Sequence, residues 1–243
     1  LNVAADPLFT ISYTGINGGM VIGVADDAGM HSSQNEQDSR YYGRSAGVPV
    51  LEPSNAQECK DYLKLAYDIS EKYDTVVLLR SNTRISHSRG IVTLGEKIEK
   101  ERIPYVKNFQ KYVAMPAMAK KLHIAQEKRL AQIAIDASGM EYDGIKLNKV
   151  EMNDPSIGII TSGICYQYVK EALPNASVLK MGLINPLPLD MIKDFAGKVE
   201  KLYMIEEGDK IAVGVSGGKD SLALLSALAE MRRFYPKKYE VVA

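Results

Sequence analysis

Short apolar runs alternate with amphipathic segments along most of the chain. Residues 20–27, 48–53 and 75–81 form apolar runs of strand length. Between the second and third runs, apolar side chains recur at helical spacing, and Ser54 with Gln57 predicts a capping box at the start of that helix. This alternation predicts an α/β fold with parallel sheets in three-layer domains.

Residues 96–150 break the pattern, because they are polar and charged, and we interpret them as a helical connector containing a helix over 117–138. After residue 150 the alternation resumes in a small α/β unit, and a last strand, turn, helix and strand begin a βαβ unit near the end of the sequence. We therefore expect four parts: residues 1–95, 96–150, 151–203 and 204–243.

Charge and cysteine content narrow the classes of function. The 30 basic and 30 acidic residues cancel, so the chain has no net charge to attract nucleic acid or an anionic membrane. No apolar run is long enough to span a membrane, and the first residues do not resemble a signal peptide. Cys59 and Cys165 are far apart, which predicts neither a disulfide framework nor a cysteine-ligated cluster. A reducing, cytoplasmic setting is the expectation.

A dense polar segment follows the first apolar run. Its donors and acceptors leave the end of a buried strand, where open α/β sheets bind their ligands. The candidate ligand-facing residues are His31, Ser32, Ser33, Gln34, Asn35 and Glu36. A solvated surface loop would have the same composition, so that alternative stays open.

A basic segment follows the third strand-like run. Arg80 and Arg84, with His87 and Arg89 nearby, are candidates to bind a carboxylate or phosphate through bidentate hydrogen bonds. The alternative is a basic surface turn whose ion pairs contribute little. Cys165 follows a Thr-Ser-Gly turn, which could bind phosphate through backbone N–H groups, and we expect its thiol to be packed and inert.

The sequence VGVSGGKDSLALL at 213–225 carries a glycine-rich turn between an apolar strand and a helix. It is one residue too short for a Walker A loop, yet its glycines, lysine and hydroxyls suit a nucleotide phosphate, and Asp220 could help to hold Mg²⁺. The candidate ATP phosphate-binding residues are Ser216, Gly217, Gly218, Lys219, Asp220 and Ser221.

Residues 1 to about 203 resemble the alpha subunit of indolepyruvate:ferredoxin oxidoreductases. The stretches VIGVADDAGMHSSQNEQDSRYY, VPVLEPSNAQE, LLRSNTRISHSRG and GIITSGICYQYVKEALPNASVLKMGLINPLP occur in the order that this family shows. The resemblance implies a pyrimidine-type thiamine-diphosphate domain followed by a small domain like the C-terminal domain of transketolase. It also implies oxidative decarboxylation of arylpyruvates to aryl-acetyl-CoA, with thiamine diphosphate and Mg²⁺ as cofactors, coenzyme A as co-substrate and ferredoxin as electron acceptor.

The same resemblance implies a beta subunit as partner, assembly into an oligomer and no membrane association. It places residues 31–36 facing thiamine and substrate. The family's activating glutamate, its Gly-Asp-Gly metal-binding motif and its iron–sulfur cysteines have no counterpart in the sequence. We therefore expect an internal fragment that is inactive on its own.

Residues 204–243 resemble a second family, the N-type ATP pyrophosphatases, and within it the tRNA thiolation enzymes of the 2-thiocytidine type. That resemblance implies ATP as ligand and tRNA as substrate. A gene fusion, or a reading frame that joins unrelated pieces near residues 201–210, would produce this order, and the incompleteness of both sites favours the second explanation. An oxidoreductase fragment is the main hypothesis, because it covers most of the chain. A PP-loop tRNA-modifying protein and a non-catalytic α/β assembly module are the alternatives.

Overall fold

The computed structural model describes residues 2–96 and 104–199, together with 208, 210–212, 229–230, 232–233 and 238–242. The chain divides into two compact units, Leu1–Val199 and Glu200–Ala243, and each is considered by itself.

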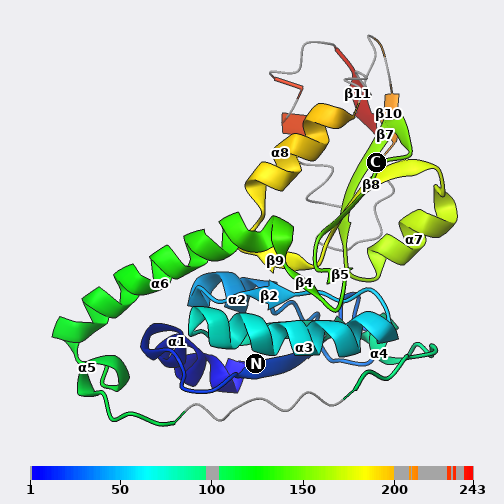
Figure 1. Cartoon of the computed structure of the whole chain (residues 1–243). Helices are drawn as coiled ribbons and strands as arrows, with labels where there is room; N and C mark the ends of the chain where they lie inside the picture. The colour runs from blue at the N-terminus through cyan, green and yellow to red at the C-terminus, as the bar shows by residue number, and fades with distance from the viewer. Residues whose placement is uncertain are drawn as a thin grey trace. The chain divides into compact units, whose positions relative to one another are not determined.

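A four-stranded sheet with the order β1-β3-β2-β9 forms the centre of the first unit (Figure 1). β1 (Val21–Asp26) and β2 (Val50–Leu51) both pair in parallel with β3 (Val77–Asn82), and β9 (Leu183–Asn185) pairs antiparallel with β2. The register places Asp26 opposite Asn82. The polar residues that follow β1 and β3 therefore emerge at one edge of the sheet.

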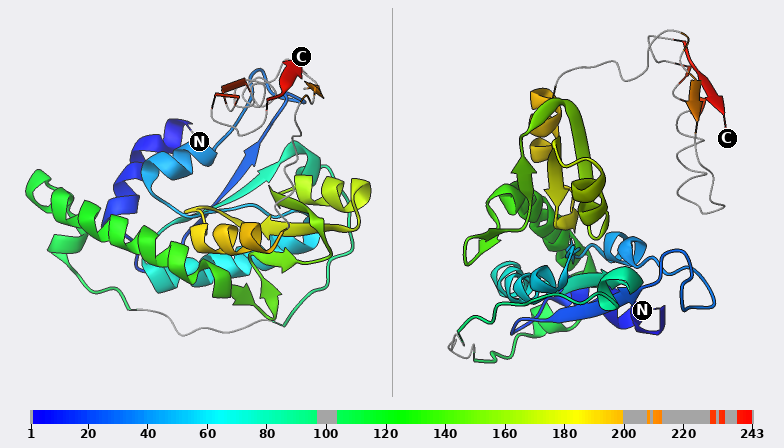
Figure 2. Two further views of the ribbon diagram at one scale, coloured as in Figure 1. Left: turned by 90° about the horizontal axis from the view of Figure 1, so that it is seen from above. Right: turned by 90° about the vertical axis from the view of Figure 1, so that its right-hand side faces the viewer.

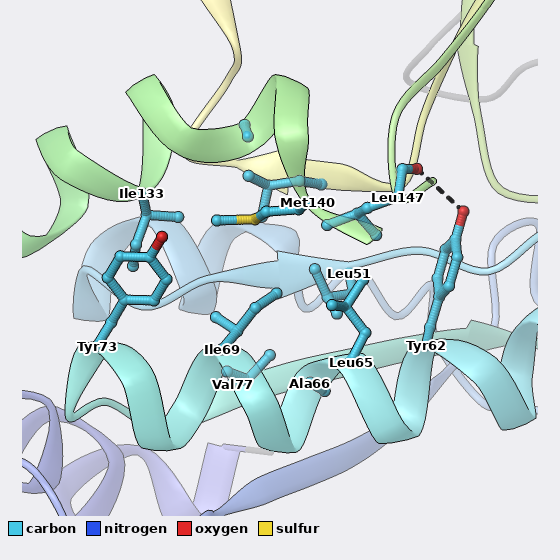
Figure 3. Packing of buried hydrophobic residues seen from close by; sticks show 12 residues of the cluster. Leu51, Tyr62, Leu65, Ala66, Ile69, Tyr73, Val77, Ile133, Met140 and Leu147 are labelled. Carbon is cyan, nitrogen blue, oxygen red and sulfur yellow. Dashed lines mark hydrogen bonds between the residues drawn. The ribbon is translucent and has the colours of Figure 1, made fainter. Parts of the chain in front are cut away.

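Helices cover both faces of this sheet, because each face carries the apolar side chains that the strand-like runs predicted. α3 (Ala56–Tyr73) packs Leu65, Ala66 and Ile69 against one face, in a core that also includes Leu51 and Val77 (Figure 3). α1 (Ala5–Thr14) and α2 (Arg40–Ala46) contribute to the core on the other face. The expected three-layer α/β arrangement is confirmed.

The start of α3 lies one residue later than the sequence indicated. The side chain of Asn55, not that of Ser54, accepts the Glu58 N–H at 2.9 Å and caps the helix. The Glu58 carboxylate in turn accepts hydrogen bonds from the Ser54 N–H and hydroxyl, each at 2.8 Å. Glu58 thus takes the role that we assigned to Gln57, but it accepts from the residue before the cap instead of from the cap itself. The cap moves to Asn55 because asparagine is as good a cap as serine.

The long charged helix predicted over 117–138 is α6 (Pro116–Asp136), and it packs along the first unit (Figure 2). Its Gln126 is buried and donates hydrogen bonds to the Ser12 hydroxyl at 2.8 Å and to the Ala46 carbonyl at 2.7 Å. Its Ile133 lies in the same core as α3. The helix is thus part of the folded core as well as a connection. The short helices η1 (Asn2–Ala4), α4 (Thr83–Ser86), α5 (Phe109–Tyr112) and η2 (Ala137–Gly139) complete this region.

A second sheet of order β6-β8-β7 follows the hairpin of β4 (Glu141–Tyr142) and β5 (Ile145–Lys146). It contains β6 (Lys149–Glu151), β7 (Asp154–Ser162) and β8 (Ala176–Met181), with α7 (Cys165–Ala172) and α8 (Leu189–Lys198) beside it. Only Gly182 separates β8 from β9 of the first sheet.

The two sheets of the first unit are also joined through α3. The buried Lys180 of β8 donates to the Glu58 carboxylate and, at 2.8 Å, to the Tyr62 hydroxyl. Residues 1–199 consequently form one compact unit, and the expected boundaries near 95 and 150 stay predictions.

In the second unit, β10 (Lys210–Ala212) pairs in parallel with β11 (Glu240–Val242), at the positions of the two predicted strands. The candidate ATP residues 216–221 lie outside the described residues. Among the helices that the structure describes, none is long and apolar enough to cross a membrane.

We expect Gly182→Ala to destabilise the first unit by about 1–3 kcal/mol, because an added methyl group would overlap the Leu147 carbonyl and stand 2.7 Å from the Tyr62 hydroxyl. Gly197→Ala is the matched control, since that glycine lies on α8 with open space around it, and alanine favours helix. Urea unfolding measures the stability of both variants. Equal midpoints for the two variants would contradict the close contact at Gly182.

Candidate functional site

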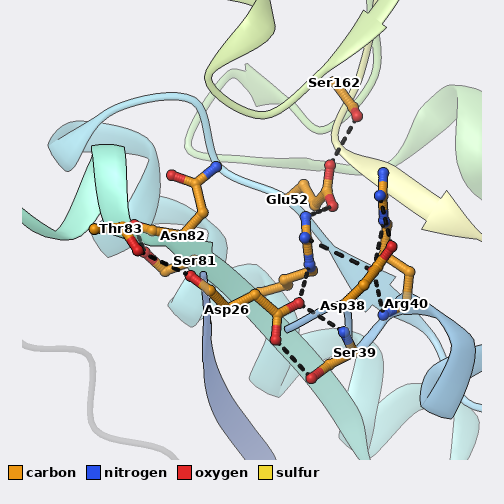
Figure 4. Close-up of polar contacts among 10 residues, drawn as sticks. Asp26, Asp38, Ser39, Arg40, Glu52, Ser81, Asn82, Thr83 and Ser162 are labelled. Atoms are coloured by element: carbon orange, nitrogen blue, oxygen red, sulfur yellow. Dashed lines mark hydrogen bonds and ion pairs between the residues drawn. The ribbon is translucent and has the colours of Figure 1, made fainter. Parts of the chain in front are cut away.

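The guanidinium of Arg80 lies at the carboxyl edge of the first sheet, among carboxylates from three segments. Figure 4 labels these carboxylates, which belong to Asp26, Asp38 and Glu52. It pairs with Asp26 at the end of β1 and with Glu52 just after β2, and its Nη2 lies 3.7 Å from Asp38 in the polar loop. The side chains of Arg80, Asp26 and Glu52 are all at least nine-tenths buried. This set of four residues is called the Arg80 cluster below.

Further hydrogen bonds satisfy the remaining oxygens of the Arg80 cluster. Asp26 accepts the Ser39 N–H and the Ser39 hydroxyl, both at 2.7 Å, and Glu52 accepts the Ser162 hydroxyl at 2.7 Å. Among the described residues, no buried side-chain polar atom lacks a partner. Ser162 ends β7, so the cluster joins the polar loop, the first sheet and the second sheet.

The expectation that Arg80 binds an external anion needs a correction. All three of its guanidinium nitrogens already face carboxylates of the chain, and the side chain is only 7% exposed. Because internal carboxylates satisfy this arginine, its role in the structure is to hold the strand ends together. Of the two arginines selected from the sequence, Arg84 remains a candidate for binding an anion.

Asp27 orders the polar loop. Its carboxylate accepts the N–H groups of His31, Ser32 and Ser33 at 3.0, 2.6 and 2.7 Å, and the hydroxyl of Thr83 at 2.5 Å. The Thr83 hydroxyl and these backbone donors hold the pKa of the Asp27 carboxyl well below its usual range. Asp27 therefore stays ionised and fixes the start of the loop against β3.

The structure separates the six predicted loop residues. His31 and Ser32 line a pocket, whereas Gln34 and Asn35 are exposed. Ser33 contributes its N–H to Asp27, and Glu36 lies half-buried near the end of the loop. Met30 holds φ at 55°, a left-handed value that is uncommon for a residue other than glycine and that accompanies functional loops.

A pocket of about 450 Å³ lies beside the loop, and we call it the anion pocket. It is lined by His31, Ser32, Thr83, Arg84, His87 and Ser88. Arg84 has no hydrogen-bond or ion-pair partner among the described residues. The Arg84 guanidinium, the two imidazoles and the Ser32 hydroxyl provide donors for a carboxylate or phosphate group, whereas the Thr83 and Ser88 hydroxyls donate to the Asp27 carboxylate and the Ile85 carbonyl.

Sequence reasoning did not select Thr83 or Ser88, and it listed His87 only with the basic segment. The parallel pairing of β1 and β3 could have indicated these residues, because residues that follow the two strands must meet at one sheet edge.

Cys165 is exposed instead of packed, and burial raises the pKa of the other thiol, Cys59. The phosphate role of the Thr-Ser-Gly turn stays a prediction, and in the structure Ser162 of this turn bonds to Glu52.

No group of three or more histidine, cysteine, aspartate or glutamate side chains among the described residues is placed to hold a metal ion. The acids of the Arg80 cluster are committed to Arg80, Ser39 and Ser162.

Removal of the Arg80 guanidinium tests its structural role. We expect Arg80→Met to lower the free energy of unfolding by about 3–5 kcal/mol, because Asp26 and Glu52 would stay buried without a cation. Arg84→Met, at an exposed arginine four residues later, should change it by less than about 0.5 kcal/mol. Chemical denaturation of both variants checks the difference; a loss below 1 kcal/mol for Arg80→Met would refute the role.

No family model matches the chain. Curated proteins do match: the indolepyruvate oxidoreductase subunit IorA of Archaeoglobus fulgidus is 41% identical over 99% of this chain and 38% of the relative. The subunit IorA of Pyrococcus abyssi is 43% identical over 85% of this chain and 33% of the relative. The chain thus spans between a third and two-fifths of the length of these relatives.

Two further proteins are similar to this chain, one in sequence over part of its length and one in fold. A tRNA-cytidine(32) 2-sulfurtransferase of Geotalea daltonii is 52% identical over 26% of this chain and 25% of the relative. A solved 2-oxoglutarate:ferredoxin oxidoreductase from Magnetococcus marinus, with 2-oxoglutarate, coenzyme A and succinyl-CoA bound, has a TM-score of 0.55. It covers 99% of this chain and 48% of the other, at 12% identity, and so supports the fold alone.

Both resemblances inferred from sequence motifs are confirmed: the chain is similar over most of its length to part of the indolepyruvate oxidoreductase subunit IorA, and over about a quarter of its length to a tRNA-cytidine 2-sulfurtransferase.

Proposed function

We propose that this chain is part of the alpha subunit of an indolepyruvate:ferredoxin oxidoreductase. The activity is the oxidative decarboxylation of an arylpyruvate to an aryl-acetyl-CoA, with electrons passed to ferredoxin. The observation that carries the proposal is the similarity to IorA over 99% of the chain. A beta subunit, coenzyme A and ferredoxin are the partners that this activity requires.

Within that activity, the anion pocket receives the carboxylate of the 2-oxo acid. It lies at the carboxyl edge of a parallel sheet, the usual ligand position in open α/β folds. Arg84 is exposed and has no partner among the described residues, so it can form a bidentate pair with a carboxylate without breaking an internal contact. The hydroxyl of Ser32 can donate to the same group.

Thiamine diphosphate would supply the decarboxylation chemistry in the assembled enzyme. The side chains of the loop from His31 to Glu36 suit contacts with its ring and with substrate. Among the described residues, no group of three or more histidine, cysteine, aspartate or glutamate side chains is placed to hold its Mg²⁺. We therefore derive no step through thiamine, and assign to this chain the orientation of the substrate carboxylate.

Kinetics of the complete oxidoreductase test the pocket. Arg84→Gln in the full-length alpha subunit should raise KM for indolepyruvate about tenfold and leave kcat within about twofold, because it removes a charge-assisted contact that substrate and transition state share. Arg89→Gln is the matched control, since Arg89 is also exposed and does not line the pocket. Equal kinetics for the two variants would show that the carboxylate binds elsewhere.

A second candidate function belongs to the C-terminal segment. The similarity to a tRNA-cytidine(32) 2-sulfurtransferase supports Mg-ATP binding by residues 216–221, with tRNA as the substrate of the activity. This candidate is independent of the anion pocket.

Calorimetric titration of the full chain with Mg-ATP tests the second candidate. Gly218→Val should abolish measurable binding, because the added side chain blocks close approach of phosphate to the backbone, and Asp220→Ala should weaken it at least tenfold. Gly197→Val on α8 is the control, as nothing surrounds that glycine. Unchanged affinity in both loop variants would refute ATP binding at this loop.

A further inference from the structure

A second pocket, of about 810 Å³, is lined by residues of α2, α6 and the segment from β9 onward, and it also reaches Asp38 and Ser162 at the Arg80 cluster; we call it the α6 pocket. One wall is the face of α6 that carries Leu130, Ala131 and Ala134. The facing wall is formed by Ile184, Pro186 and Leu187, from β9 and the chain that follows it. The volume is within the range of small-molecule sites, which is about 300–1,000 Å³.

The end of the α6 pocket formed by α2 is cationic. Arg40 and Arg44 are four residues apart, so they lie on one face of the helix. Arg40 is engaged with Asp38 through two hydrogen bonds of 2.8 and 2.7 Å. Arg44 has no ion pair or side-chain hydrogen bond among the described residues, so its guanidinium is available to a ligand.

Charges around the pocket limit the ligand to one negative group. Besides Asp38, the lining includes Glu127 of α6, whose carboxylate oxygen is 3.9 Å from the His123 ring. A phosphate dianion would face this carboxylate, whereas a single carboxylate can pair with Arg44 at the other helix. The aliphatic walls in turn favour an apolar body over a polar one.

We propose that the α6 pocket is a binding site for an amphipathic monocarboxylate, with the carboxylate on Arg44 and an aromatic or aliphatic body between α6 and the segment after β9. The site is separate from the anion pocket, and it does not depend on the oxidoreductase function.

A matched pair of ligands tests the proposal on the full chain. Naphthalene-1-acetate and its neutral amide share the same ring system, so their difference in Kd isolates the contribution of the carboxylate. NMR titration of the native chain should give a Kd for the acid about three- to tenfold lower than for the amide, with shifts at the Ala131 and Ala134 methyl groups. Arg44→Gln should remove that difference and leave amide binding unchanged.

Two variants on the surface of α6 test where the apolar part of the ligand binds. Ala131→Trp should fill the pocket and weaken both ligands at least tenfold, while Ala125→Trp, at an exposed alanine of the same helix outside the lining, should leave both unchanged. Both positions are exposed, so neither variant should unfold the chain, and circular dichroism confirms this.

Two results would overturn the proposal. If neither ligand changes the NMR chemical shifts, the α6 pocket is a packing surface for other parts of the protein. An acid-to-amide difference that survives Arg44→Gln would place the carboxylate elsewhere.

Discussion

The buried guanidinium of Arg80 is the contact on which the arrangement of the first unit's polar edge depends. It faces Asp26, Glu52 and Asp38, which come from the end of β1, the segment after β2 and the polar loop. Burying several charges is costly unless each is paired and hydrogen-bonded, and here Ser39 and Ser162 complete the set. The network therefore ties together three segments that are far apart in the sequence.

The two adjacent aspartates at the end of β1 bind different partners. Asp26 points into the Arg80 cluster, whereas Asp27 binds the first N–H groups of the loop and the Thr83 hydroxyl. Their alternation follows from the period of two along a strand. One side chain stabilises the sheet edge, and its neighbour shapes the loop that lines the anion pocket. Consecutive residues thus hold the sheet edge together and order the loop beside it.

Most of the architecture could be predicted from the sequence, because apolar periodicity reports burial directly. The strands β1, β3 and β7 and the helices α3 and α6 appear close to where the pattern placed them. The cap at Asn55 could not, since the neighbouring Ser54 is an equally good cap. The exposure of Cys165 could not either, since it depends on tertiary neighbours that periodicity does not encode. Arg80 shows the same limit: its place after a strand indicated an anion site, but the sequence does not reveal that the anions are the chain's own carboxylates.

Amide hydrogen exchange, resolved by NMR along residues 31–39, tests most directly whether the two aspartates hold the loop. We predict slow exchange at Ser32, Ser33 and Ser39, whose N–H groups bind the Asp27 and Asp26 carboxylates. Exchange should be fast at Gln34 and Asn35, whose N–H groups have no acceptor among the described residues. Uniformly fast exchange from Ser32 to Ser39 would contradict this prediction, because the loop would then not be fixed at the sheet edge.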